Sequence, residues 1–151
     1  TLCSFLEDEG HQATTAATFE AAADLLGSTE FDLIFIDIIL GSGQSGIDLL
    51  RLVKQIAPSS EVIIITGAPT VDSASHALRL GALDYIVKPV RQDTLLRTTD
   101  LALKHKVLRE TKESYRLNLE AIFRRVRVAI ITVNGRLEVV EANPAAAEAS
   151  T

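Results

Sequence analysis

The sequence predicts an α/β fold built on a parallel sheet. Over the first hundred residues, short apolar runs rich in Ile, Leu and Val alternate with helical segments of about ten residues. Hydrophobic residues make up 47% of the chain, which is enough for a core, and aromatic residues make up only 5%. Strands that alternate with helices indicate βαβ units, whose right-handed crossovers place helices on both faces of the sheet.

Apolar runs bounded by polar residues mark the expected strands. Residues 33–36 read Leu-Ile-Phe-Ile and residues 62–65 read Val-Ile-Ile-Ile, and their length and β-branched content favour buried strands over helices. A weakly apolar run at residues 12–16 precedes the first of these strands, and a short apolar run at residues 84–87 follows the second. The expected strands are therefore residues 12–16, 32–38, 61–66 and 84–87.

Periodic apolar residues and stop signals mark the helices between these strands. A glycine follows three of the segments, at Gly10, Gly27 and Gly81, and Pro58 lies just beyond a fourth. The expected helices are residues 2–9, 19–26, 47–56, 71–80 and a further one from residue 92 onward.

Beyond residue 100 the pattern changes to one long, highly charged helix, over about Leu101–Arg127. Apolar residues recur along it every seven positions, as in a coiled coil: Leu101, Leu108, Tyr115 and Ile122. The positions that would complete the apolar seam are polar: Lys104, Thr111, Asn118 and Arg125. We expect this helix to pair with that of a second chain. The alternative is a single helix that packs against the next domain.

The last residues predict the antiparallel beginning of another domain. Strands are expected at Ala129–Val133 and Leu137–Val140, joined by an Asn134-Gly135 turn, and Asn143-Pro144 opens an Ala-rich helix. The predicted organisation is therefore a first domain over residues 1–103, a linker helix over 104–127 and the start of a second domain over 128–151.

Charge and composition narrow the class of protein. The net charge of −5 is uneven, because residues 1–103 are acidic and residues 104–127 are basic. The basic segment has no interleaved aromatic residues, so a solvated helix face is favoured over nucleic-acid or membrane binding. We find no apolar run long enough to cross a bilayer and no signal peptide. The single cysteine, Cys3, excludes an intramolecular disulfide and fits a cytoplasmic protein.

Three predicted strands end in polar residues that can act together: Asp37, Thr66 and Lys88. The carboxyl ends of parallel strands meet at one edge of a sheet, where reactive sites of such folds lie. A carboxylate can accept a phosphoryl group when a divalent cation cancels charge and donors reach the phosphoryl oxygens. Lys88 would supply a positive charge and Thr66 a hydroxyl group. Taken singly, each has an ordinary interpretation as a turn residue, a helix cap or a solvated charge.

These residues lie in stretches that resemble the response-regulator receiver family. They are FDLIFIDIILGSGQSGIDLL at residues 31–50, EVIIITGAPT at 61–70 and ALRLGALDYIVKPV at 77–90. The resemblance covers about residues 1–103 and implies a flavodoxin-like, doubly wound parallel sheet. It also implies that Asp37 is phosphorylated, that Thr66 and Lys88 contact the phosphoryl group and that Asp37 and the Ile39 carbonyl bind Mg²⁺. Tyr85 would be the aromatic switch that couples to Thr66.

The chain departs from the family pattern in two places. The loop from Gly41 to Gly46 is glycine-rich, where the family usually has a Pro at the position of Gly41 and a shorter loop. The family's first strand, with the acidic pair that binds Mg²⁺, would precede residue 1 and lie centrally in the sheet. Asp8 and Glu9 follow the first helix on the wrong side of the domain, so we do not assign them as metal ligands.

Residues 118–150 resemble the opening of a PAS sensory domain, with a helix, a strand, a two-residue turn, a strand and then Asn-Pro-Ala-Ala. The charged helix before them resembles a signalling helix.

We therefore expect a regulatory phosphoacceptor module, not an enzyme, that a partner histidine kinase phosphorylates. A homodimer would form through the last receiver surface and the helix 104–127, and nucleic acid would be contacted only through an output domain outside this sequence. The preferred parent is a transcriptional activator. The alternatives are a hybrid or PAS-containing histidine kinase and a pseudo-receiver that binds without turning over phosphate.

Overall fold

The computed structural model describes residues 1–40 and 44–149. The chain divides into two compact units, Thr1–Val107 and Leu108–Thr151. The predicted Gly41–Gly46 loop lies partly outside the described residues, at positions 41–43.

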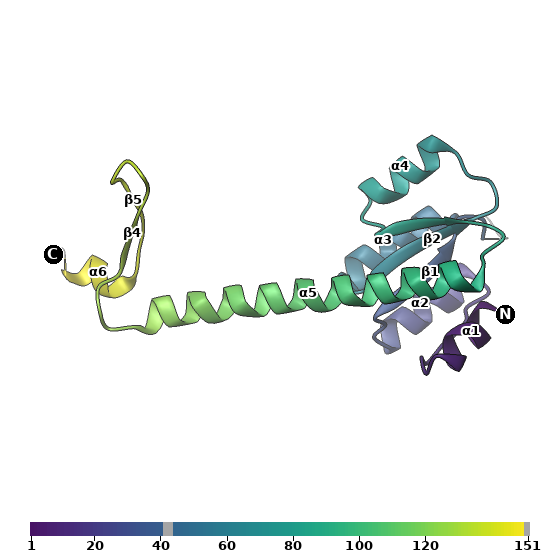
Figure 1. Ribbon diagram of the computed structural model, residues 1–151, viewed down its shortest axis with the longest axis horizontal. Helices are drawn as coiled ribbons and strands as arrows, with labels where there is room; N and C mark the ends of the chain where they lie inside the picture. Colours follow the sequence, from purple (N-terminus) through teal and green to yellow (C-terminus); the bar gives the residue numbers. More distant parts are fainter. Residues whose placement is uncertain (41–43, 150–151) are drawn as a thin grey trace. The chain divides into compact units, whose positions relative to one another are not determined.

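A three-stranded parallel sheet forms the centre of the first unit (Figure 1). Its strands are β1 (Leu33–Asp37), β2 (Glu61–Thr66) and β3 (Asp84–Val87), in the order β1-β2-β3. Every residue of β2 is buried, because this strand has a neighbour on each edge and helices on both faces. The predicted parallel α/β fold is confirmed.

Helices cover both faces of this sheet, and alternate residues of β2 face each layer. Val62 and Ile64 pack on one face with residues of α2 (Phe19–Ser28), α3 (Gly46–Ile56) and α4 (Val71–Arg79). Ile63 and Ile65 pack on the other face with Leu2 of α1 (Leu2–Asp8) and Ala102 of α5 (Gln92–Arg125). This two-sided core explains why the two apolar runs are continuous in sequence.

One expected strand is absent, and the expected end of one helix is wrong. Residues 12–16 form no strand, because β1 pairs with β2 along one edge and no described strand lies along its other edge to pair with them. Gly27 does not end α2, which continues to Ser28. The amide of Thr29 donates to the Leu25 carbonyl at 2.9 Å, so the helical bonding passes through the glycine.

The second unit contains the antiparallel pair β4 (Ile131–Val133) and β5 (Val139–Ala142), followed by α6 (Pro144–Ala149). The two predicted strands and the helix are present, but the strands begin two residues later than expected, at Ile131 and Val139, and the two-residue turn is wrong. Val133 pairs with Val139, so the loop is longer than Asn-Gly alone, and Leu137 adopts a φ of 63°. The Asn134 side chain accepts hydrogen bonds from the amides of Arg136 and Glu138 across this loop, at 2.8 and 3.1 Å.

Asn143 is fully buried in the second unit, and both polar atoms of its side chain are hydrogen-bonded. Its Oδ1 accepts from the amides of Ile130 and Ala146, at 2.9 and 3.0 Å. Its Nδ2 donates to the carbonyls of Val128 at 2.9 Å and Val126 at 3.3 Å. One side chain thus joins the residues after α5 to the first turn of α6.

No helix within residues 1–40 and 44–149 is both long and apolar enough to cross a membrane.

Candidate functional site

The carboxyl edge of the sheet brings together the three strand-end residues of the sequence analysis. Asp37 ends β1 and lies in register with Ile65, the residue before Thr66. The amide of Lys88, just after β3, donates to the Thr66 carbonyl at 2.8 Å. Backbone pairing therefore aligns all three residues at one edge before any side-chain contact forms.

The two carboxylate oxygens of Asp37 have different partners. Lys88 Nζ donates to Oδ2, and the backbone amide of Ile39 donates to Oδ1 at 3.1 Å. The Asp37 side chain is 31% exposed and that of Lys88 is 46% exposed. An exposed ion pair of this kind contributes little to stability, and this one leaves the carboxylate accessible from solvent.

Thr66 is buried, and its Oγ1 accepts from the amide of Ala68 at 3.2 Å. The hydroxyl hydrogen remains available to donate toward the edge of the sheet. Gly67 follows, and a Cβ at this position would meet only the Lys88 Cδ, at the ordinary contact distance of 3.9 Å. Packing therefore does not require a glycine at position 67. The Lys88-Pro89 peptide bond is cis.

Gly46 is a site residue that sequence reasoning treated only as the end of a loop. Its amide donates to the Ile38 carbonyl at 2.9 Å. A Cβ here would lie 2.1 Å from the backbone oxygen of Asp37. The start of α3 can approach the end of β1 this closely only because residue 46 has no side chain.

Tyr85 lies on β3 and packs against the core on the side of α4. Its hydroxyl group lies 3.3 Å from Ser73 Oγ in the first turn of α4. Sequence reasoning missed Ser73, because its contact with a strand residue depends on how α4 packs.

The oxygen donors at this edge are of the kind that Mg²⁺ prefers. The Asp37 carboxylate and the Ile39 carbonyl are both hard oxygen ligands, and Mg²⁺ commonly binds one or two carboxylates and keeps several waters. No three His, Cys, Asp or Glu side chains within the described residues could hold a metal ion together. Asp8 and Glu9 lie at the end of α1 and are exposed.

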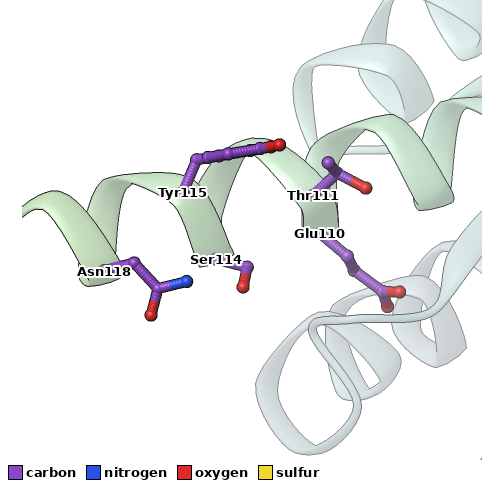
Figure 2. Close-up of a pocket in the computed structure, with 5 residues that line it drawn as sticks. All are labelled: Glu110, Thr111, Ser114, Tyr115 and Asn118. Atoms are coloured by element: carbon purple, nitrogen blue, oxygen red, sulfur yellow. The ribbon is translucent and has the colours of Figure 1, made fainter.

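A separate hollow of about 310 Å³ lies along α5 (Figure 2). Its lining comes from this helix alone and contains none of the strand-end residues: Glu110, Thr111, Ser114, Tyr115 and Asn118. A hollow formed by a single helix is an open groove, so we assign no ligand site to it.

Known proteins resemble this chain mainly in its first unit. A family model described as the response regulator receiver domain matches residues 1–100. The alginate biosynthesis transcriptional regulatory protein AlgB of Pseudomonas aeruginosa is 42% identical over 90 residues, covering 60% of this chain and 20% of that protein. The nitrogen assimilation regulatory protein NtrX of Azorhizobium caulinodans is 36% identical over 114 residues, covering 74% of this chain and 25% of that protein. The chain thus spans a quarter or less of these relatives.

Solved structures agree with this likeness. The receiver domain of NtrX from Brucella abortus is 35% identical with a TM-score of 0.65, covering 68% of this chain and 87% of that chain. The beryllofluoride-activated NtrC4 receiver domain dimer is 31% identical with a TM-score of 0.66, covering 70% of this chain and 86% of that chain. A response regulator from Burkholderia pseudomallei is 26% identical with a TM-score of 0.61, covering 80% of this chain and 72% of that chain. Its structure holds a phosphorylated aspartic acid, a calcium ion and citrate.

Proposed function

Because the chain belongs to the response regulator receiver domain family, we propose that Asp37 accepts a phosphoryl group from a partner histidine kinase. The observation that carries this proposal is the accessible Asp37 carboxylate, with Lys88 bonded to one oxygen and the Ile39 amide to the other. Receiver domains of response regulators are regulatory and not enzymes, so the product is a phosphorylated signalling state. The phosphorylated aspartic acid of the Burkholderia structure supports the same chemistry here.

In the proposed transfer, one oxygen of Asp37 attacks the phosphorus atom of a phosphohistidine. The new O–P bond forms as the N–P bond breaks, and the released electron pair stays on the imidazole nitrogen, which then takes a proton from solvent. Lys88 leaves the carboxylate and pairs with a phosphoryl oxygen, because the transferred group now carries the negative charge. The Thr66 hydroxyl donates to another phosphoryl oxygen.

A divalent cation fits the donors at this edge. Asp37 and the Ile39 carbonyl would hold Mg²⁺ together with water, and the ion would cancel charge on the incoming phosphoryl group. The residues of the chain orient the reaction: the Ile39 amide fixes the carboxylate, and Gly46 lets α3 begin directly beside it.

Phosphorylation would change the surface of the receiver through Thr66 and Tyr85. When Thr66 turns toward the phosphoryl group, the switch side chain Tyr85 would change its position on β3. Helix α5 would pass this change to the residues beyond it, which resemble a PAS domain. We propose a cytoplasmic transcriptional activator as the parent protein, since AlgB and NtrX are regulatory proteins of transcription and nitrogen assimilation.

The first prediction concerns the phosphoacceptor itself. Full-length protein incubated with acetyl phosphate and Mg²⁺ should gain one phosphoryl group, because the O–P bond of acetyl phosphate breaks and acetate leaves. Intact-mass spectrometry measures the added mass. Asp37→Asn should abolish the gain, because an amide is a poor nucleophile.

Asp72→Asn is the matched control, since Asp72 is an exposed carboxylate in the first turn of α4. It should be phosphorylated like the wild type. Equal phosphorylation of the Asp37→Asn variant would rule out Asp37 as the acceptor. If the wild type gains no phosphate, the chain is a binding module of the pseudo-receiver kind.

A further inference from the structure

The hydroxyl group of Tyr85 meets α4 through one side chain, Ser73, at an oxygen–oxygen distance of 3.3 Å. We propose that Ser73 is a positioning residue that holds the switch side chain Tyr85 against the first turn of α4 before Asp37 is phosphorylated. The proposal deepens the function above and rests on it, because it assigns the contact that Tyr85 must release.

Ser73 also belongs to the capping box that starts α4. Its Oγ accepts from the amide and hydroxyl of Thr70, at 3.2 and 2.9 Å, and donates to the Thr70 carbonyl at 3.0 Å. A serine hydroxyl has one hydrogen to donate and two lone pairs. These three bonds use that capacity fully, so the Tyr85 hydroxyl is a fourth neighbour that competes with them.

This competition makes the Tyr85–Ser73 bond easy to exchange. The tyrosine ring is packed against the core beside Ile64, its register partner on β2, so packing anchors the ring while the hydroxyl makes the replaceable contact. When Tyr85 leaves, Ser73 keeps its three capping bonds to Thr70 and loses only the competing neighbour. Release of the switch therefore does not disrupt the start of α4.

The Tyr85–Ser73 bond should affect the phosphorylation rate of Asp37 by shifting the populations of the two Tyr85 orientations. A bond that exists only in the resting orientation of Tyr85 stabilises the resting state, and its loss favours the orientation that accompanies phosphorylation. Removing the Ser73 hydroxyl should therefore increase the phosphorylation rate of Asp37 by about threefold, the effect of one neutral hydrogen bond.

The test uses full-length protein with 3-fluorotyrosine incorporated at position 85 alone. Fluorine NMR reports the environment of the phenol, and phosphorylation by acetyl phosphate with Mg²⁺ is measured on the same samples. Ser73→Ala should shift the fluorine resonance and raise the rate about threefold. Ser73→Thr keeps a hydroxyl group at this position and should restore the wild-type resonance and rate.

Thr70→Ala is the matched control, because it breaks the capping box but leaves Ser73 Oγ for Tyr85. Because it also removes one competing donor to Ser73 Oγ, Tyr85 should keep its contact, and the phosphorylation rate should stay at or below that of the wild type. Equal effects of Ser73→Ala and Thr70→Ala would show that Ser73 acts only as a helix cap and would overturn the proposal. If the wild-type protein gains no phosphate, the proposed function fails. A shift of the fluorine resonance in Ser73→Ala would still show that the Tyr85–Ser73 contact exists, so the two failures can be distinguished.

Discussion

Asp37 is oriented from two directions, and neither depends on a neighbouring acidic residue. The amide two residues later holds Oδ1, as in an Asx turn, and Lys88 holds Oδ2 from the third strand. The turn after β1 therefore sets the carboxylate orientation, while Gly46 allows α3 to start against the Asp37 backbone.

Gly46→Ala should destabilise the receiver unit by about 1–3 kcal/mol, because the new methyl group would meet backbone atoms that cannot move aside cheaply. The urea midpoint of unfolding measures this loss. Gly27→Ala is the matched control: Gly27 lies inside α2 with nothing within 4 Å of a Cβ, so alanine should stabilise the protein by about 0.5–1 kcal/mol. A neutral Gly46→Ala change would contradict the steric argument.

Sequence patterns predict the residues at this edge better than they predict the contacts between them. Asp37, Thr66 and Lys88 are recognisable because each ends a strand, and strand ends meet by topology. The close approach at Gly46 and the contact from Ser73 to Tyr85 depend on how helices pack after the sheet has formed. No local pattern encodes these distances, so the sequence shows only a glycine and a serine.

At the scale of single elements, the first turn of α3 is stabilised by a capping box. Ser45 is its N-cap, and Ser45 and Asp48 form a reciprocal capping box. The Ser45 amide and hydroxyl both donate to Asp48 Oδ2, at 3.1 and 2.9 Å. The hydrogen bond from the Ser45 amide, followed by that from its hydroxyl, lowers the pKa of Asp48 below its ordinary value of 3.8.

The capping box should make stability depend on pH. Because the pKa of Asp48 is lower in the folded state, its contribution is fully present above the ordinary pKa and is lost as the pH falls through the folded-state pKa. Urea midpoints of the wild type and Asp48→Asn should therefore differ at neutral pH and converge in acid below about pH 4. A difference that persists unchanged into strong acid would mean that the Asp48 charge has no part in the cap.

The absent strand over residues 12–16 and the misplaced end of α2 have a common cause. Local composition alone predicts a strand at the first and a helix stop at Gly27. A strand also needs a neighbour to pair with, and a glycine ends a helix only where the chain takes a left-handed turn, as it does at Gly81 with a φ of 98°. The apolar run of β2 predicts its strand well because every residue of this strand is buried, whereas β1 is half-buried except at Ile36 and pairs with β2 along its whole length.

At the scale of the whole molecule, α5 is tied to the sheet at the edge opposite to Asp37. Glu61, at the start of β2, has a side chain only 3% exposed, and His105 Nδ1 lies 3.1 Å from its Oε1. Next to it, Lys106 donates to Asp32 at 2.6 Å. Residues more than forty positions apart meet here, so no local sequence pattern predicts these contacts.

The four apolar residues of the seven-residue repeat along α5 are all exposed. Its members are Leu101 at 58%, Leu108 at 70%, Tyr115 at 67% and Ile122 at 58% exposure. We propose that this apolar seam pairs with a second copy of the chain, as a coiled coil would.

Leu108→Glu should weaken self-association of the full-length protein about tenfold, because it would place a charge in the seam. Analytical ultracentrifugation measures the dissociation constant. Leu117→Glu is the control, since Leu117 is also exposed, at 51%, but lies off the repeat; it should associate like the wild type. A monomeric wild type, or equal weakening by both substitutions, would contradict pairing through the seam.

The connections of α5 to its two units differ in their chemistry. Toward the sheet it is held by the ion pair of Lys106 with Asp32 and by His105 beside Glu61, whereas its far end is joined to the hairpin through Asn143, an uncharged amide with both of its polar atoms bonded. Salt screens exposed charges but leaves a buried amide unaffected. Ionic strength would therefore weaken the Lys106–Asp32 pair, whose Asp32 side chain is 74% exposed, more than the contact of the buried Glu61 or the junction at Asn143.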